Sequence, residues 1–299
     1  MIDVTLLGCG GVMPLPGRAL TSLFVRYNGN AILIDCGEGT QIELRRNKLK
    51  YSQIDTILIT HFHGDHVCGI TGLLLSFGLD GRTAPLKIYG PKGLTEIIKA
   101  FLIVAPNLPY EIICHEFNEN YVEFKEIGLI INAFKVKHSV DCYGYRIDLL
   151  RSPKFDPEKA RALNIPIEYW KVLQKGETVG SFDPKDIFGE NRKGISILYA
   201  TDTRPVYNIT KFGDNCDLMV LESMYNDAEH QEKAEENNHM TMAEALSIAK
   251  ECKPSALWLT HFSPALLEPN ELEAEVKSQY ENATVGFDGL STTLNFTEI

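Results

Sequence analysis

The chain has 299 residues, of which 44 % are hydrophobic and 23 % charged, and its net charge is −11. These values are typical of a globular protein with one large domain or two smaller ones. The acidic balance argues against binding of nucleic acid or anionic membrane over the whole surface, and without a run of eighteen apolar residues no transmembrane helix is expected. The seven scattered cysteines, mostly in apolar surroundings, favour a reduced, cytoplasmic protein over a disulfide scaffold.

Short apolar strands and glycine-rich turns alternate in the first third of the chain. The N-terminal stretch has no basic start or cleavage site, so it is interpreted as a first strand and turn rather than a signal peptide. Residues 21–37 predict two strands joined by a hairpin at Asn28-Gly29-Asn30. Residues 54–60, IDTILIT, indicate a strand buried on both faces. Helices are expected over residues 69–78 and 93–105.

The middle of the chain changes character twice. Alternating apolar and polar residues over 121–139 predict strands that end near His138. Residues 151–194 are rich in Pro, Gly and charge and poor in long apolar runs, so we interpret them as an inserted arm rather than core. This arm holds nine Lys and Arg residues against seven Asp and Glu, in an otherwise acidic chain. On charge alone, the simplest interpretation of the arm and of the basic cluster at 45–50 is a solvated face.

The last third returns to strands and helices. Strands are expected within 195–203, 216–223 and 256–262, helices over 241–252 and 268–281, and two further strands at the end. Thr241 with Glu244 forms a capping-box motif, so a helix is expected to start at Thr241. Repeated strand–helix units predict an α/β protein whose sheets are packed between helices.

A cluster of metal-binding residue types follows the buried strand at 54–60. The motif His61-x-His63-x-Asp65-His66 places three imidazoles and one carboxylate at the end of this strand. Imidazole and carboxylate together suit Zn²⁺, with Mn²⁺ and Fe as competitors. A single histidine is more often a structural residue, but three in six positions beside an aspartate indicate a metal site.

Further ligand candidates follow later strands in the same way. His138, Asp202 and His261 each come one or two residues after an apolar run, so they are expected at the same rim of the sheets. Together with the motif they provide seven ligands, enough for two metal ions that share one carboxylate. Two ions roughly 4 Å apart are suited to a hydrolytic displacement.

The motif and its spaced partners resemble the metallo-β-lactamase superfamily along the whole chain apart from the arm. The closer resemblance is to the ribonuclease Z family, the endonucleases that remove the 3′ trailer of tRNA. It is carried by LGCGGVMPLPGRALTS (7–22), CGEGTQ (36–41), ITHFHGDHVCGITGLL (59–74), FDPEKARALNIP (155–166), ATDTRP (200–205) and HMT (239–241).

This resemblance implies a fold and a metal site. The fold would be a four-layer αβ/βα sandwich, a single metallo-β-lactamase-like domain over residues 1–299 with the inserted arm at 151–194. Two Zn²⁺ ions would bind in each subunit. One zinc would be held by His61, His63 and His138. The other would be held by Asp65, His66 and His261, and Asp202 would bridge the two.

The resemblance also implies catalytic roles. Asp65 would orient or deprotonate the attacking water, and His239 would protonate the leaving oxygen with Glu222 orienting it. A histidine suits proton donation because its unperturbed pKa of about 6.5 lies near working pH. From the residues alone, His239 could equally be a surface residue of an acidic loop. Asp35 and Glu38 could brace the metal-site histidines or cap the next helix, and we expect a structural role for both.

The implied substrate is precursor tRNA, cut after the discriminator base to leave a 3′-hydroxyl on the tRNA. The arm would be an exosite for tRNA, and the substrate-binding candidates are Arg18 in the first loop and Lys159, Arg161 and Lys171 in the arm. A homodimer is expected from the same resemblance, while the cysteines and the missing long apolar run predict a cytoplasmic protein without membrane association.

Three departures from the family pattern keep alternatives open. The arm lacks a Gly-Pro pair, the first loop keeps Arg18 but neither the family's lysine nor its asparagine, and Glu222 follows Leu221 instead of a histidine. A phosphodiesterase of the same fold that acts on a small or cyclic phosphodiester is therefore the main alternative.

Other classes fit the sequence less well. A non-catalytic nucleic-acid-binding subunit would be expected to lose ligands, and all seven are present. A β-lactamase or thioesterase is compatible with the fold alone, although no secretion signal supports the first. No redox-pair motif and no flavin domain support an oxygen-reducing diiron enzyme.

Overall fold

The computed structural model describes residues 1–226 and 228–297. It divides the chain into two compact units, which are described separately. The main unit holds residues 1–148 and 196–295, and the arm unit holds residues 149–195 with the C-terminal end from Phe296. Among the described residues, no helix has the length and apolarity needed to cross a membrane.

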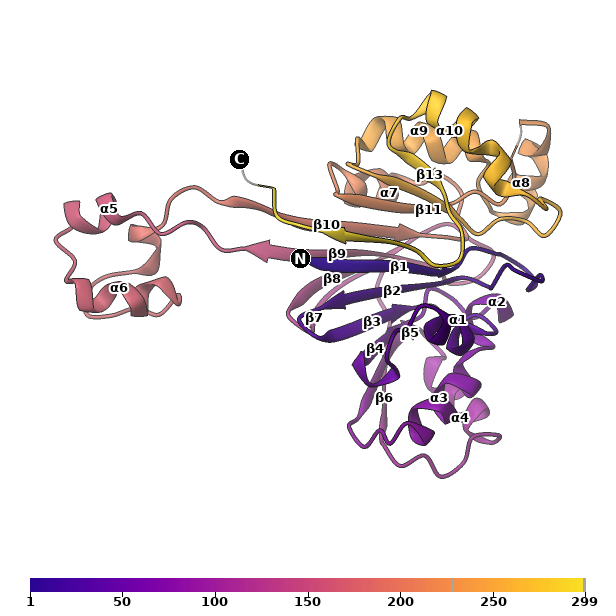
Figure 1. Ribbon diagram of the computed structural model, residues 1–299, viewed down its shortest axis with the longest axis horizontal. Coiled ribbons are helices and arrows are strands. Elements are labelled where there is room, and N and C mark those ends of the chain that lie inside the picture. The colour runs from indigo at the N-terminus through magenta and orange to yellow at the C-terminus, as the bar shows by residue number, and fades with distance from the viewer. Residues whose placement is uncertain (227, 298–299) are drawn as a thin grey trace. The chain divides into compact units, whose positions relative to one another are not determined.

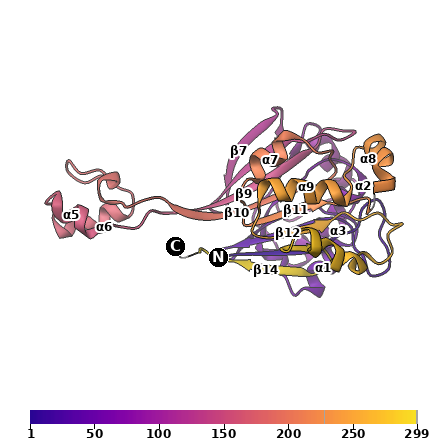
Figure 2. The same cartoon turned by 90° about the horizontal axis from the view of Figure 1, so that it is seen from above.

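The main unit consists of two seven-stranded sheets between layers of helices (Figures 1 and 2). This is the four-layer α/β sandwich predicted from the sequence. The first sheet has the strand order β14-β1-β2-β3-β4-β5-β6. Its strands are β1 (Ile2–Gly8), β2 (Ser22–Tyr27), β3 (Asn30–Ile34), β4 (Ile54–Leu58), β5 (Leu86–Pro91), β6 (Ile112–Phe117) and β14 (Leu290–Leu294).

The second sheet has the order β13-β12-β11-β10-β9-β8-β7. Its strands are β7 (Tyr121–Glu126), β8 (Leu129–Lys135), β9 (Tyr143–Arg151), β10 (Arg192–Ala200), β11 (Leu218–Glu222), β12 (Leu257–Thr260) and β13 (Ala283–Val285). The two strands expected at the end of the chain join different sheets, because β13 pairs with β12 and β14 pairs with β1.

The helices of the main unit lie outside the sheets. The first sheet is covered by α1 (Thr40–Arg46), α2 (Gly64–Val67), α3 (Ile70–Leu79) and α4 (Leu94–Leu102), and the second by α7 (Tyr207–Gly213), α8 (Gln231–Asn237), α9 (Met242–Cys252) and α10 (Glu273–Gln279). Short 3₁₀ turns lie at η1 (Tyr51–Gln53), η3 (Ala228–His230) and η4 (Pro269–Leu272). The predicted capping box is confirmed, since the Thr241 and Glu244 side chains each bond the other residue's backbone N–H.

Local sequence signals explain the strands that position the site. The predicted hairpin joins β2 and β3, with Asn28 and Gly29 both at the positive φ that a type I′ turn requires. β4 lies between β3 and β5, parallel to both, and its apolar residues are buried as expected. The helices α3 and α4 pack on this sheet around a core that includes Ile57, Leu73 and Ile88.

The arm unit has a small hydrophobic core of its own. It contains α5 (Pro157–Ala162), α6 (Ile167–Gln174) and the 3₁₀ turn η2 (Pro184–Ile187). Ala160, Ile165, Leu173 and Ile187 are buried against one another, and Trp170 packs against them. Asp156 caps α5 through the backbone N–H groups of Glu158 and Lys159. The low apolar content of this segment is therefore sufficient for a compact unit.

Candidate metal centre

The histidine motif lies in the loop between β4 and α2. β4 ends at Leu58, and His63 is the N-cap residue of α2, so the chain turns sharply between His61 and His66. His61 and His66 are fully buried, and Thr60 donates both its N–H and its hydroxyl to Asp35. This turn brings the side chains of the motif to one side of the loop.

The remaining ligand candidates lie at strand ends of the second sheet. His138 follows β8, Asp202 follows β10 and His261 follows β12. Asp202 and His261 have φ values of 54° and 58°, a left-handed conformation that is uncommon outside glycine. Such conformations cost about 1 kcal/mol or more and are concentrated at functional sites. Here they turn two side chains back toward the histidine motif.

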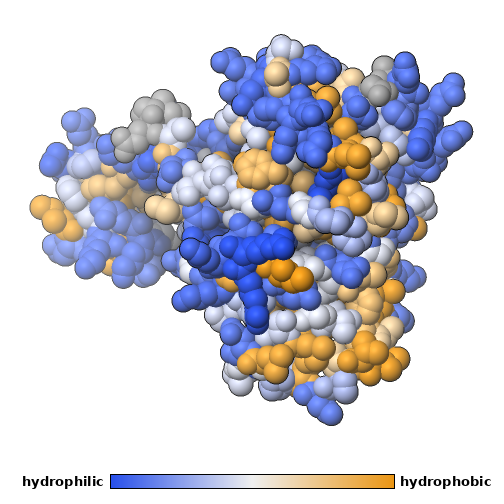
Figure 3. Space-filling view, turned by 45° about the vertical axis from the view of Figure 1, so that its right-hand side comes forward, coloured by the Kyte–Doolittle hydropathy of each residue, from blue (hydrophilic) through white to orange (hydrophobic). Residues whose placement is uncertain are grey.

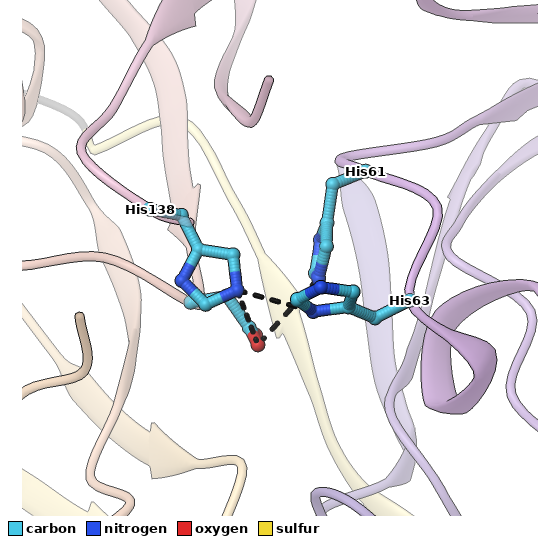
Figure 4. A group of neighbouring side chains, drawn as sticks. His61, His63 and His138 are labelled. Carbon is cyan, nitrogen blue, oxygen red and sulfur yellow. Dashed lines mark hydrogen bonds and ion pairs between the residues drawn. The ribbon is translucent and has the colours of Figure 1, made fainter. Parts of the chain in front are cut away.

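The structure brings the seven predicted ligands into two overlapping groups. One group consists of His61, His63, His138 and Asp202, and the other of Asp65, His66, Asp202 and His261. In each group the candidate ligand atoms lie within 4.8 Å of one another, and Asp202 is the residue common to both. Figure 4 shows His61 and His63 from one side of the site pointing toward His138 on the other.

The hydrogen bonds of the histidine rings leave lone pairs that fit a cation. His66 Nδ1 lies 2.9 Å from Asp35 Oδ2, and His138 Nδ1 lies 3.1 Å from the Asn238 carbonyl oxygen. Since these acceptors fix the proton on Nδ1, each Nε2 presents a lone pair to the site. The buried His61 Nε2 has no hydrogen-bond partner, and it lies 3.6 Å from Asp202 Oδ2. The residues therefore fit divalent metal ions.

Two buried carboxylates beside His66 favour positive charge at this position. Asp202 Oδ1 lies 3.1 Å from His66 Nε2, while Asp35 lies at the other ring nitrogen. Burial lowers the pKa of His66, but Asp202 and Asp35 outweigh burial and raise the pKa well above its ordinary value. Burial has the opposite effect on Asp202 and raises its pKa. The surrounding histidines outweigh burial and hold the pKa of Asp202 well below its ordinary value. A cation is thus favoured here, and metal binding releases the proton.

The first glycine-rich loop packs directly against the second group of ligands. The Val12 N–H donates to Asp65 Oδ2 at 2.7 Å, and Val12 has a φ of 69°, a strained conformation for a β-branched residue. Gly11 lies so close to His261 that a Cβ atom there would be 2.6 Å from the ring. The loop therefore fixes the orientation of Asp65 and leaves His261 no room to rotate.

Replacing Gly11 with Ala is expected to displace His261 and to weaken metal binding about 10- to 100-fold, as for other changes around metal ligands. The reason is that the added methyl group overlaps the His261 ring, which is enclosed on its other sides. Isothermal titration with Zn²⁺ and metal analysis would measure the effect. Gly189→Ala is the matched control, since its Cβ would meet only the Lys154 carbonyl oxygen at 3.4 Å. Equal affinities in the two variants would contradict the prediction.

His239 and Glu222 lie at the edge of the metal groups. His239 Nδ1 is 2.9 Å from Glu222 Oε2 and 3.9 Å from Asp202 Oδ2. Glu222 is fully buried at the end of β11, and its other oxygen accepts the Thr203 N–H. Burial lowers the pKa of His239, but the charge of Glu222 and its hydrogen bond raise it to about 9. The arrangement holds a protonated imidazole beside the metal ligands.

A cavity of about 390 Å³ opens onto these groups. Its walls include Asp65, Asp202, His239 and His261, together with the apolar side chains of Val12, Met13, Pro14 and Leu20. The cavity therefore exposes His239 and residues of both ligand groups to the same bound molecule.

The substrate-binding candidates lie elsewhere. Arg18 is buried and donates to the carbonyl oxygens of Ser263, Leu266 and Leu267, so its guanidinium group fastens the loop after β12. This set of partners gives Arg18 a structural role and leaves no support for the predicted substrate contact. The other three candidates lie on the surface of the arm unit, on α5 for Lys159 and Arg161 and on α6 for Lys171.

Asp35 braces a metal-site histidine, one of the two roles that the sequence left open for it, whereas Arg204 received no role from the sequence. Asp35, at a φ of 59°, accepts hydrogen bonds from Thr60 and His66, whereas Glu38 is exposed at the cavity wall. Arg204, in the ATDTRP stretch, donates to the carbonyl oxygen of His239. Asp35 directly precedes the CGEGTQ motif and Arg204 lies within ATDTRP, but the motifs did not say which partner each residue contacts.

Comparisons with known proteins place the chain in a family. The family model of the anti-Pycsar protein Apyc1 matches residues 2–105, and that of the beta-lactamase superfamily domain matches residues 187–262. The ribonuclease Z of Lachnoclostridium phytofermentans is 46 % identical and covers 99 % of both chains. That of Agathobacter rectalis is also 46 % identical, over 100 % of both chains. The chain belongs to the ribonuclease Z family.

A solved structure agrees with this assignment. The human tRNase Z, short form, is 26 % identical, has a TM-score of 0.72, and covers 98 % of this chain and 100 % of its own. The resemblance to the ribonuclease Z family and the four-layer fold predicted from the sequence are thus confirmed. As a member of the ribonuclease Z family with a divalent metal site, the chain is a hydrolase that cleaves phosphodiesters.

Proposed function

We propose that this protein is a zinc-dependent endoribonuclease that removes the 3′ trailer from precursor tRNA and leaves a 3′-hydroxyl on the tRNA. The observation that carries the proposal is the Glu222–His239 pair at the edge of the two ligand groups. Hydrolysis of a ribose ester needs a proton for the leaving 3′-oxygen, and this pair supplies one beside the site where charge on phosphate is neutralised. The family assignment supports the same activity.

The residues suggest how the proton transfers are divided. Two Zn²⁺ ions, held by the two groups with Asp202 between them, would lower the pKa of a water molecule and neutralise phosphoryl charge. Asp65, held by the Val12 N–H, orients the water and accepts its proton. As the bond between water oxygen and phosphorus forms, the bond from phosphorus to the 3′-oxygen breaks. His239 gives its proton to that 3′-oxygen.

The arm unit is proposed to bind tRNA through its own basic side chains. Lys159, Arg161 and Lys171 are exposed on its helices, in a segment whose charge is positive within an acidic chain. Lysine and arginine side chains on a surface bind the phosphate backbone without reading sequence. The small core of the arm holds these helices in place.

Cleavage of an end-labelled precursor tRNA tests the proposed function. Zinc-loaded protein is expected to cut once, after the discriminator base, and His239→Ala and Asp65→Ala are expected to lose that cut. Hydrolysis of a small or cyclic phosphodiester that requires Asp65, without any cleavage of precursor tRNA, would reject the tRNA assignment in favour of a small-diester phosphodiesterase.

Replacing Glu222 with Gln is expected to move the basic limb of the pH–rate profile to lower pH by about 1 to 3 units. His239 must be protonated to act as an acid, and the charge of Glu222 raises its pKa to about 9 against the effect of burial. Without that charge the pKa falls, so activity is lost at a lower pH while the acidic limb stays in place. Profiles of kcat between pH 5 and 10 for both proteins would measure the shift, and superimposable basic limbs would contradict it.

We also propose a homodimer. Apolar side chains gather on the part of the main unit that carries α3 and α4 (Figure 3). Leu79 at the end of α3 is 91 % exposed, and Ile103 and Val104, directly after α4, are 78 % and 66 % exposed. Several highly exposed apolar side chains on one part of a surface are typical of subunit interfaces. The cytoplasmic location remains a prediction, which the seven free cysteines support.

The variant Leu79→Glu with Ile103→Glu is expected to be a monomer at concentrations where the unmodified chain is a dimer. Two buried, unpaired carboxylates at an interface cost several kcal/mol, enough to dissociate it. Light scattering after size-exclusion chromatography would give both masses. Tyr207→Glu, at an exposed aromatic residue of α7, is the matched control and should remain dimeric. A monomeric unmodified chain would contradict the proposal.

A further inference from the structure

We infer that Arg204 is a positioning residue that holds the proton donor His239 in place for the leaving oxygen; this inference rests on the proposed role of His239. Arg204 does not line the metal cavity. Its guanidinium Nη1 donates to the His239 carbonyl oxygen at 2.6 Å and to Glu244 Oε2 at 2.9 Å. Its Nη2 is bonded to Glu244 Oε1. One planar group therefore ties the backbone of His239 to the first turn of α9.

His239 needs such a constraint because of where it lies in the chain. It belongs to the link between α8 and α9, directly after Asn238, which has a left-handed φ of 57°. Links between helices are more mobile than the helices themselves. The imidazole is hydrogen-bonded to Glu222 at Nδ1, and the His239 N–H donates to the Ala234 carbonyl oxygen at 2.9 Å, but these two contacts leave the carbonyl group of His239 free to rotate. Fixing the carbonyl group of the same residue removes that freedom.

The residues around Arg204 connect this constraint to the rest of the site. Asp202, Thr203 and Arg204 are consecutive. Asp202 is common to both ligand groups, the Thr203 N–H donates to Glu222, and Arg204 holds the His239 carbonyl. The tripeptide thus touches the metal ligands, the carboxylate that orients the acid, and the backbone of the acid itself. Its own position is set by the segment after β8, since the Arg204 N–H donates to the Lys137 carbonyl at 2.9 Å.

Glu244 completes the arrangement. Its carboxylate accepts the Thr241 N–H at 2.9 Å as part of the capping box, and it pairs with Arg204 at the same time. The helix cap and the arginine therefore share one anion, and the segment from His239 to Thr241 is held at both ends. Lysine would keep the positive charge at position 204 but lacks the planar fork that reaches His239 and Glu244 together.

The dependence of the rate on the leaving group separates positioning from other roles. A ribose 3′-oxygen needs protonation to leave, whereas p-nitrophenolate leaves without it. We would measure kcat and KM of metal-loaded protein with precursor tRNA and with bis(p-nitrophenyl) phosphate for Arg204→Gln, Arg204→Lys and His239→Ala. Arg26→Gln, at an arginine that pairs with Asp3, is the matched control. Metal content and melting temperature would be measured for each variant.

For Arg204→Gln we expect kcat on precursor tRNA to fall about 10- to 100-fold, the loss typical of a catalytic group displaced by about 1 Å. The rate with bis(p-nitrophenyl) phosphate, the KM values and the metal content should match the control, and Arg204→Lys should restore part of the lost rate. His239→Ala should show the same selectivity for the poor leaving group, with a larger loss.

The other outcomes overturn the inference in distinguishable ways. Equal losses on both substrates, with lost metal or a lower melting temperature, would mean that Arg204 only supports the fold. A higher KM for tRNA with unchanged kcat would mean that Arg204 contacts a phosphate group of the tRNA. If His239→Ala loses more activity on precursor tRNA than on bis(p-nitrophenyl) phosphate, but neither Arg204 variant does, then Arg204 does not position His239. The assignment of His239 as the acid would stand. If His239→Ala lowers kcat equally on both substrates, His239 is not the acid, and the inference about Arg204 is rejected with that assignment.

Discussion

Replacing Asp202 with Ala is expected to lower the rate of phosphodiester hydrolysis by at least about 10³-fold and to leave fewer than two metal ions per chain. Several kcal/mol of charge stabilisation in the transition state depend on the metal ions, and each 1.4 kcal/mol is tenfold in rate. Asp202 is the residue common to both ligand groups, and its Oδ1 lies 3.1 Å from the Nε2 atoms of His66 and His261. Its loss therefore removes a candidate ligand from both groups.

Metal analysis and activity measured on the same preparations would check this expectation. Asp202→Asn is the informative comparison, because it keeps the shape of the side chain and one carbonyl ligand while removing the charge. It should retain more metal than Asp202→Ala. If Asp202→Ala still binds two ions tightly per chain and its rate is near that of the unmodified protein, metal binding does not depend on Asp202, and the prediction is wrong.

Excision of the arm, with residues 152–191 replaced by a short turn, is expected to lower kcat/KM for precursor tRNA about 10- to 100-fold, the effect of removing about three cations that bind phosphate. Hydrolysis of bis(p-nitrophenyl) phosphate should not change. The remaining fold should survive, because the buried side chains of the arm pack on one another around Ile165 and Leu173. Excision would join β9 to β10, neighbours in the second sheet whose arrows run in opposite directions in Figure 1.

A charge variant separates the cations of the arm from its bulk. Lys159→Gln with Arg161→Gln and Lys171→Gln is expected to keep the arm folded, since these side chains are exposed and the buried core around Leu173 is unchanged, although the bond from Lys159 to the Phe188 carbonyl oxygen is lost. Its kcat/KM for tRNA should fall similarly, and the dependence on salt concentration should become shallower by roughly one power for each phosphate-binding cation replaced. An excised protein that processes precursor tRNA at the unmodified rate would show that the arm does not bind the substrate.

The local features of the fold could be predicted because local rules determine them. The turn at Asn28-Gly29 needs residues that tolerate positive φ, and the capping box of α9 needs Thr241 and Glu244 three residues apart. The buried strand β4 follows from its unbroken apolar run. In each case the physical cause spans fewer than ten residues, so the sequence displays it directly.

The candidate site could be predicted only in part. Its candidate ligands could be named because each follows an apolar strand, and the resemblance to a known family grouped them. The left-handed turns at Asp35, Asp202 and His261 left no local sign, because a non-glycine residue adopts that conformation only when surrounding contacts compensate for its cost. The contact between Arg204 and His239 joins residues 35 positions apart, and the burial of Arg18 depends on a loop almost 250 residues away.

The order of the ligands along the chain has a consequence for synthesis on the ribosome. The histidine motif at 61–66 emerges early, Asp202 follows much later, and His261 comes near the end. β1 also stays unpaired on one edge until β14 is made, because Ile2 pairs with Leu294. Long-range contacts of this kind form late in folding. A nascent chain therefore carries the histidine motif without a complete centre, and the ability to cut RNA arises only after His261 and β14 have been made.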